Sequence, residues 1–330
     1  MLTYIGRRLL YMVPTVILIS MVAFVIIQLP PGDYLTALAA QLSQQGQSLD
    51  HAQLVTLEHR YGLGQPIYVQ YGKWIWAILS HGDFGQSFEW NRPVSALVSQ
   101  RLPMTIVLGF TTVIFTWIVA FPVGIYSAIR QYSPGDYVAT TLTFLGVAVP
   151  NFLIALVLMY LGYRFFGLTV GGLFSPDFEN AGWNLGKLLD LFSHLWVPVV
   201  VLGAAGAAGL VRTLRANLLD ELHMPYVVAA RARGVPERRL LFRYPLRVAL
   251  NPFISTIGWV LPTLVSGEIV VAQVLSLPTT GPLLLESLES QDMYLAGSLI
   301  LIVSVLTVVG TLISDICLAW LDPRVRLRYK

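Results

Sequence analysis

Long apolar stretches separated by short polar segments dominate this sequence. Six stretches reach the roughly 20 apolar residues that a hydrocarbon core of about 30 Å requires. They cover about 9–29, 103–129, 137–165, 196–218, 248–275 and 294–320. Because a helix satisfies its own backbone hydrogen bonds, we predict an all-α integral membrane protein with six transmembrane helices. An even number of spans places both termini on one side.

The distribution of basic residues predicts which side that is. Of the 21 Lys and Arg residues, 15 lie on the side of the two termini. Basic residues concentrate in cytoplasmic segments, so we predict that both termini and the loop at about 219–247 are cytoplasmic. The 15 residues are Arg7, Arg8, Arg130, the eight arginines from Arg212 to Arg247, Arg324, Arg326, Arg328 and Lys330.

Composition agrees with a membrane protein and excludes several functions. Mean hydropathy is +0.68, and only 12% of residues are charged. A net charge of +3 gives little support to a nucleic-acid partner, and the single cysteine, Cys317, cannot form an internal disulfide. The chain has no G-x-x-x-x-G-K-[ST] phosphate-binding loop and no nucleophile–base or metal-ligand spacing. We therefore expect neither an enzyme nor a protein that hydrolyses ATP by itself.

The chain divides into a first span at 1–29, an extracytoplasmic segment at 30–101 and a five-helix core at 102–330. Asp50 can cap a first amphipathic helix in the outer segment, and Pro66 can open a second one. Such helices can lie on the membrane or pack on the outer ends of the spans. The apolar positions are Leu54, Leu57 and Tyr61 in the first helix, and Ile67, Tyr71, Trp74, Ile75 and Ile78 in the second.

Prolines lie within or near spans two to five. Pro122, Pro150, Pro198 and Pro262 each remove a backbone hydrogen bond and are expected to bend their helices. Bent spans suit a protein that opens and closes, although they also occur in rigid membrane proteins.

A dense basic block, Pro225 to Pro252, interrupts the apolar sequence. Pro225 can open a helix and Gly234 can close it, which gives about nine residues and roughly 14 Å. Ala229 and Ala230 make this helix small enough to enter a groove of another protein. The alternative is a basic loop that only sets orientation. Pro236 would start a second segment, which Pro245 ends.

Acids deep in apolar runs are candidates for a polar pathway. Glu268 and Asp315 should each cost about 2.5–3.5 kcal/mol near a helix centre unless they are paired or hydrated. Asp315 equally fits a hydrogen bond between helices near the inner end of its span. Between the last two spans, Pro278 and Gly281 predict a tight re-entrant turn at the outer face, which makes them gate candidates.

Several blocks in order resemble one known family over nearly the whole chain. They read YIGRRLLYMVPTVILISMVAFVIIQLPPGD, YGLGQPIYVQYGKWIWAILSHGDFGQSF, RPVSALVSQRLPMTIVLG, YVVAARARGVPERRLLFRYPLRVALNP and LDPRVR. The sequence is similar to the transmembrane permease subunits of binding-protein-dependent ABC importers, in the dipeptide, oligopeptide and nickel branch. The resemblance implies the type I ABC importer permease fold and a multi-pass location in a bacterial-type inner membrane.

The resemblance also implies partners and roles. Ala229, Ala230 and Gly234 match the motif of the coupling helix, and Arg231, Arg233 and Arg238 would meet the surface of a cytoplasmic ATPase. The implied partners are a second homologous permease, two ATPase subunits, an extracytoplasmic substrate-binding protein and membrane lipid. This chain would bind no cofactor, since ATP and Mg²⁺ belong to the ATPases. It would form half of the translocation pathway for peptides or similar small solutes.

Departures from the family pattern leave the solute class open. Tyr244 stands where the family usually has histidine, and Ala272 and Leu275 stand where it has glutamate and phenylalanine. Oligosaccharides and opines are therefore alternative solutes. A secondary transporter driven by an ion gradient, with Glu268 and Asp315 as coupling acids, is the alternative from another class. Inverted repeats would mark such a transporter, and we find none in the sequence.

Overall fold

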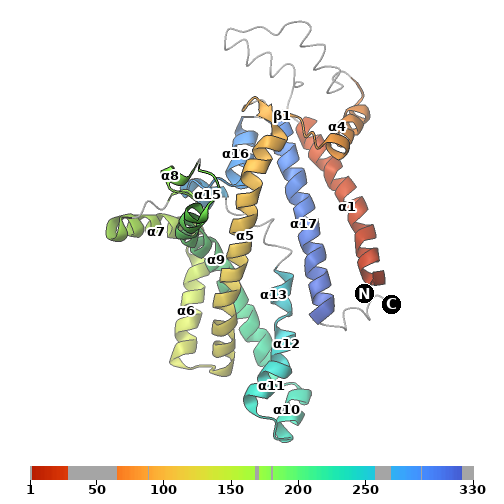
Figure 1. Cartoon of the computed structure of the whole chain (residues 1–330). Coiled ribbons are helices and arrows are strands. Elements are labelled where there is room, and N and C mark those ends of the chain that lie inside the picture. Colours follow the sequence, from red (N-terminus) through yellow and green to blue (C-terminus); the bar gives the residue numbers. More distant parts are fainter. Residues whose placement is uncertain are drawn as a thin grey trace. The chain divides into compact units, whose positions relative to one another are not determined.

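The computed structural model describes residues 2–28, 65–87, 89–167, 171–179, 181–256, 269–290 and 292–321. These residues are mainly helical (Figure 1). They form two compact units. Unit 1 comprises Met1–Leu10, Met104–Thr279 and Leu306–Lys330, and unit 2 comprises Tyr11–Pro103 and Thr280–Val305.

Four helices in the described residues are long and apolar enough to cross a membrane. The apolar stretches are Ile5–Ile26 in α1 (Leu2–Gln28), Val94–Ile129 (α5), Leu185–Leu222 (α9) and Tyr294–Trp320 in α17 (Met293–Leu321). A fifth candidate is the bent pair α6 (Pro134–Ala148) and α7 (Asn151–Phe166). Each matches one of the predicted apolar stretches.

The predicted span at 137–165 is not one continuous helix. Helices α6 and α7 meet at an angle of 104°. Pro150 has no backbone N–H, and it disfavours the helical conformation of the residue before it. Val149 is accordingly extended, with ψ of 126°, and ends α6. The bend expected from Pro150 is therefore a full break.

The predicted span at 248–275 is described in part. Two short helices, α12 (Pro245–Ala249) and α13 (Asn251–Ser255), lie at its start, and α15 (Ile269–Val274) lies at its end. Residues 257–268 lie outside the described residues, as does the predicted helix that begins at Asp50. The total of six spans therefore remains a prediction, as does the cytoplasmic side of the termini.

Helix α9 forms the centre of unit 1. In its most apolar stretch, 67% of the residues are buried. Small residues bring it close to α5 and α6. A Cβ atom on Gly203 would lie 2.5 Å from Cδ1 of Phe115, and one on Gly124 would lie 2.9 Å from Cδ2 of Leu214. Close approach at small residues is the usual way in which helices associate in membranes.

A partly buried ion pair joins α6 to α9. The guanidinium of Arg215 donates to both carboxylate oxygens of Asp136, from Nε at 3.1 Å and from Nη2 at 2.9 Å. Asp136 also accepts the backbone N–H of Tyr132, and its own N–H is capped by Ser133 Oγ. This bidentate pair fixes the start of α6.

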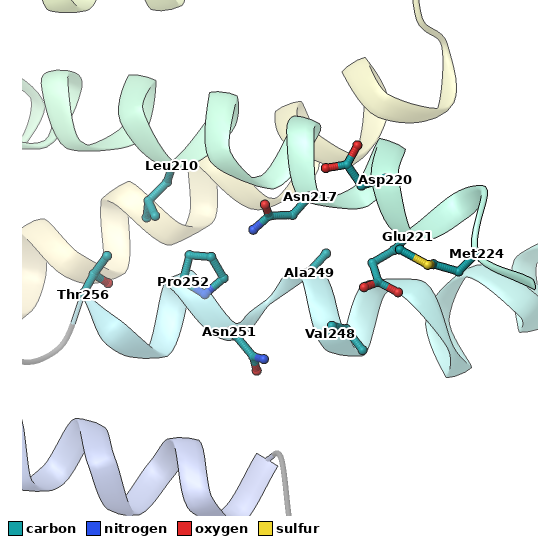
Figure 2. A pocket seen from close by; sticks show the side chains of 10 residues that line it. All are labelled: Leu210, Asn217, Asp220, Glu221, Met224, Val248, Ala249, Asn251, Pro252 and Thr256. Atoms are coloured by element: carbon teal, nitrogen blue, oxygen red, sulfur yellow. The ribbon is translucent and has the colours of Figure 1, made fainter. Parts of the chain in front are cut away.

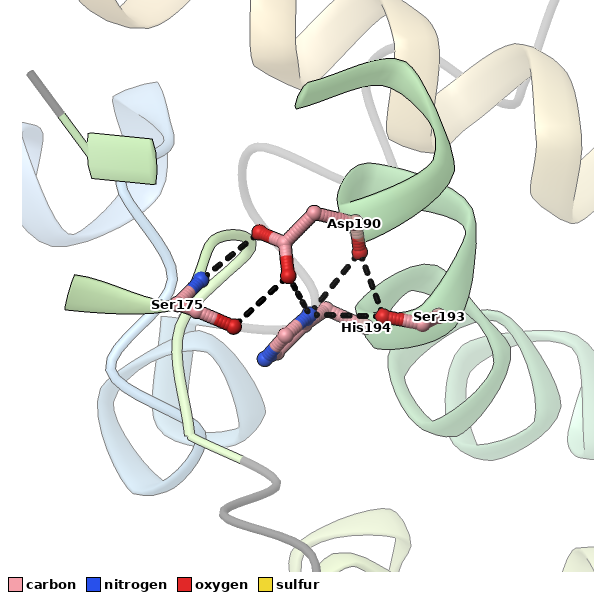
Figure 3. A network of polar contacts seen from close by, with 4 residues as sticks. All are labelled: Ser175, Asp190, Ser193 and His194. Carbon is pink, nitrogen blue, oxygen red and sulfur yellow. Dashed lines mark hydrogen bonds and ion pairs between the residues drawn. The ribbon is translucent and has the colours of Figure 1, made fainter. Parts of the chain in front are cut away.

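A polar network at the other end of α9 fixes the connection from α7 (Figure 3). Asp190 accepts from the backbone N–H of Ser175 at 2.7 Å and from its hydroxyl at 2.6 Å. His194 Nδ1 lies 2.9 Å from the carbonyl of Asp190. Ser175 precedes the short helix α8 (Pro176–Glu179), so the network fastens this connection to α9.

Lys187 also stabilises this connection, and its charged side chain is buried. Its ammonium donates to the carbonyls of Glu179 and Ala181, and it lies 4.8 Å from the ring centroid of Phe174. Hydrogen bonds and the ring face compensate for the desolvation of this charge.

Unit 2 contains a helical core and a small hairpin. Residues of α1, α4 (Ile67–His81), α5, α16 (Thr280–Glu289) and α17 contribute to its core. Strands β1 (Gln86–Ser87) and β2 (Arg92–Pro93) pair antiparallel. Asp292 accepts from the hydroxyl of Ser87 and from the N–H of Leu295, which joins the hairpin to the start of α17.

We expect Gly203→Ala to destabilise the protein by about 1–3 kcal/mol, because its methyl group would overlap the ring of Phe115. Gly209→Ala on the same helix is the matched control, since nothing lies within 4 Å of its Cβ position. Thermal unfolding of the detergent-solubilised protein measures both. Equal midpoints for the two variants would contradict the packing described for α5 and α9.

Candidate functional site

The cytoplasmic loop predicted from sequence contains the expected short helix. Helix α10 spans Pro225–Ala232, eight residues, with Pro225 in its first turn. Gly234 has a φ of +77°, which glycine adopts without strain. The N–H of Val235 bonds to the carbonyl of Ala230, and the N–H of Gly234 bonds to that of Arg231. This pair of bonds is a Schellman cap, so the predicted start and end of the helix are confirmed.

A second short helix packs on α10. Helix α11 spans Glu237–Arg243 after the N-cap residue Pro236, and Pro245 opens α12 directly afterwards. Val227 and Leu240 are fully buried between the two helices, together with Ala230. Tyr244, the departure from the family pattern, is partly buried against this cluster. The loop therefore has a small apolar core of its own.

The two alanines lie on different faces of α10. Ala230 is 8% exposed, whereas Ala229 is on the exposed side. Tyr226 and Val228 are also exposed, at 43% and 51%. The surface of α10 that another protein could contact therefore includes Ala229, and Ala230 supports it from within.

The arginines of the loop also differ in their surroundings. Nε of Arg231 donates to Oε1 of Glu237 at 2.6 Å, and Nη2 donates to Oε2 at 3.3 Å. The hydrogen-bonded guanidinium lowers the pKa of the Glu237 carboxyl. Arg233 and Arg238 are exposed. A partner surface would thus meet an Arg231 charge that is already balanced inside the loop.

A pocket of about 730 Å³ adjoins α10 (Figure 2). The last turns of α9, the segment 248–252 and Met224, the N-cap of α10, form its walls. The phenol of Tyr226 donates to the carboxylate of Glu221, which links α10 directly to the pocket wall. The lining residues are Leu210, Asn217, Asp220, Glu221, Met224, Val248, Ala249, Asn251, Pro252 and Thr256.

The residues of the polar wall of this pocket are not among the site residues predicted from the sequence. Asn217, Asp220 and Glu221 have i, i+3, i+4 spacing and therefore share one face of α9. A polar face at the end of an otherwise apolar span can be recognised from the sequence, and it indicates a polar site.

The gate candidates in the described residues belong to different elements. Asp315 lies 3.1 Å from Nη1 of Arg8, so it forms an ion pair between α17 and α1. Pro278 follows α15, where the N–H of Leu277 bonds to the carbonyl of Ala272 and Ser276 has a φ of +51°. Gly281 is buried in the first turn of α16. Glu268 lies outside the described residues.

The fold and the loop together define a class. Several apolar helices, one of them broken, and a short capped helix in a basic loop are features of a membrane transport permease. In fold, the chain resembles a subunit of the MetNI methionine ABC transporter in an inward-facing conformation, with a TM-score of 0.53 and 14% identity. The match covers 68% of this chain and 96% of that one.

The comparisons identify the family. Residues 120–327 match the model of the binding-protein-dependent transport system inner membrane component, and residues 1–109 match its N-terminal model. The chain belongs to this family and is a permease subunit of a binding-protein-dependent ABC importer, a multi-pass protein of the inner membrane.

Curated relatives extend over the full length. The chain is 38% identical to the oligopeptide transport system permease protein AppB of Bacillus subtilis, over 98% of this chain and 99% of that protein. It is 31% identical to the oligopeptide transport system permease protein OppB of Salmonella typhimurium, over 99% and 100%. The peptidoglycan transport system permease protein YejB of Agrobacterium fabrum is 29% identical, over 98% and 97%.

We expect Ala230→Asp to open the loop, because it places a charge among Val227 and Leu240. Ala229→Asp is the matched control on the exposed side. Limited trypsin digestion, which cuts at the loop arginines, measures the opening. Loss of about 1.4 kcal/mol of local stability would make cleavage of the Ala230 variant about tenfold faster. Equal rates for both variants would show that α10 and α11 do not pack as described.

Proposed function

We propose that this permease is one of two transmembrane subunits of an ATP-driven importer, and that α10 is its coupling helix. The observation that carries the proposal is the exposed face of α10 at Ala229, on a helix held at both ends by Pro225 and Gly234. Small side chains on a short, rigid helix suit insertion into a groove of another protein. Membership of the permease family makes a cytoplasmic ATPase the expected owner of that groove.

The loop is built to transmit movement rather than to absorb it. Val227, Ala230 and Leu240 pack α10 on α11, and α11 continues into α12 with one residue between them. Leu246 and Ala249 of α12 are buried against α9 in a larger cluster. A displacement of α10 by an ATPase would therefore reach α9 and α12 through packed side chains.

The pocket beside α10 is the proposed inner end of the translocation pathway. Its walls come from α9 and the 248–252 segment, and Tyr226 of α10 bonds to Glu221 in the wall. Movement of α10 would change the shape of this pocket. The pocket offers carboxylates and amides beside apolar side chains, a lining that suits weak contact with a polar solute in transit. This chain would supply half of the pathway and a homologous permease the other half.

Peptides are the proposed solutes, delivered by an extracytoplasmic binding protein. The support is that relatives over the whole length, AppB and OppB, are named as oligopeptide transport permeases. The relatives are permeases of this same kind, which favours ATP-driven import over an ion-driven transporter. The ion pair of Asp315 with Arg8 also fits a structural role better than a coupling acid.

To test coupling, we expect Ala229→Trp to weaken binding of the ATPases by about tenfold or more, since the indole would overfill the groove. Uptake by the reconstituted importer should fall with it, while membrane insertion is retained. Gln131→Trp, on the exposed turn after α5, is the matched control. Unchanged co-purification and unchanged uptake in the Ala229 variant would refute the assignment of α10.

Arg231 requires a further control, because reversing its charge also breaks the pair with Glu237. The double variant Arg231→Glu with Glu237→Arg restores an ion pair inside the loop but inverts the charges presented outward. If the ATPase contacts Arg231, the double variant stays defective. Recovery in the double variant would limit Arg231 to a role within the loop.

To test the energy source and solute together, we expect uptake of labelled oligopeptides into proteoliposomes to require the ATPases, ATP and the binding protein. Competition with unlabelled peptides and oligosaccharides then defines the solute class. Uptake by this chain alone would overturn the ATP-driven function. Competition by oligosaccharides and not by peptides would overturn the solute proposal and leave the mechanism standing.

A further inference from the structure

Helix α4 has two apolar faces, and the structure covers one of them. Its inner face packs into the core of unit 2 through Tyr71, Trp74, Ile75 and Ile78. A second stripe is exposed and consists of Tyr68, Trp76 and Leu79, at 72%, 69% and 77%. The spacings i, i+8 and i+11 place these three side chains on one face. Gly72 lies between them in the same row, with nothing within 4 Å of its Cβ position.

The contacts of α4 define where it lies along α1. The hydroxyls of Tyr71 and Ser20 are 2.7 Å apart, and the rings of Trp74 and Phe24 have centroids 5.5 Å apart. The candidate span of α1 ends at Ile26. Ser20 and Phe24 are therefore roughly 9 and 3 Å below the end of the span, at 1.5 Å per residue. Figure 1 shows α4 beside this end of α1.

The neighbouring surface of α1 is apolar and exposed as well. Met21, Val22 and Val25 are 45%, 59% and 50% exposed, on the side of α1 that does not pack on α4. In a membrane-spanning helix, such a surface faces lipid. The stripe of α4 lies at the depth where this lipid-facing surface ends.

The residue types of the stripe match that depth. Tyr and Trp are enriched where hydrocarbon meets headgroups, because each has an apolar ring and a polar group. Leu79 adds hydrocarbon contact, whereas the polar residues Gln70 and His81 lie on the opposite side of the helix. An apolar side and a polar side are features of helices that bind at this boundary.

We propose that α4 is an interfacial anchor whose Tyr68–Trp76–Leu79 face binds membrane lipid at the boundary between headgroups and acyl chains. The anchor lies at the end of the first span that, by the predicted topology, is extracytoplasmic. It would hold α4 at the membrane surface and orient the β1–β2 hairpin that follows it. The proposal is independent of the solute and of ATP coupling.

Site-directed spin labelling in lipid vesicles tests the anchor. Cys317, the single cysteine of the chain, is first replaced by serine. Labels are then attached to Trp76→Cys and Leu79→Cys, with His81→Cys as the matched control at an exposed polar position on the opposite side of the same helix. The assembled importer is reconstituted in phosphatidylcholine and phosphatidylglycerol. Collision rates with oxygen, which enters lipid, and with a water-soluble nickel chelate are measured at each position.

The expected result is a ratio of oxygen to nickel collisions several-fold higher at Trp76 and Leu79 than at His81. Their depths should fall within about 5–10 Å of the headgroup boundary. High nickel collision rates at all three positions would overturn the proposal, especially if added binding protein then shields the stripe. Low rates of both collisions would also overturn it, because the stripe would then be covered by protein.

Discussion

Close packing against α9 is the interaction on which unit 1 depends. Gly203 admits the ring of Phe115, and Gly124 admits Leu214, so α5 and α9 approach more closely than larger residues would allow. The Arg215–Asp136 pair then fixes α6 on the same helix. In a bilayer, water does not drive apolar helices together, so small residues and internal polar pairs must hold them.

In the loop of α10 and α11, the residues that support the surface differ from those that form it. Val227, Ala230 and Leu240 form its interior, whereas Ala229 and the exposed arginines form its exterior. The pair of Arg231 with Glu237 belongs to both, because it braces α10 on α11 and lies at the surface. A residue in such a motif can thus be required for folding or for contact. A loss of function alone does not tell which.

Polar residues in the rest of the chain mostly hold connections in place. Ser175, Asp190 and His194 fasten the α7–α9 connection, and Lys187 is enclosed by carbonyls and an aromatic ring. Asp315 is paired with Arg8. A low-dielectric surrounding makes an unpaired charge costly, so each of these charges has a protein partner. The pocket beside α10 differs, since its carboxylates and amides line an open volume.

The sequence by itself determined the membrane class, the positions of the long helices, and the ends of α10. The length of an apolar stretch determines where a spanning helix lies, and Pro225 and Gly234 determine the ends of α10. These hydrophobic and steric effects are local and need no contact with a distant part of the chain. It also predicted the bend at Pro150, but not that the helix would break by 104°. The tertiary structure decided which of Ala229 and Ala230 is exposed, because that depends on where α11 packs. It likewise paired Asp136 with Arg215 and Asp315 with Arg8. The pocket wall comes from segments about 30 residues apart in the sequence. Such contacts depend on how the helices meet in space, which no local sequence pattern specifies.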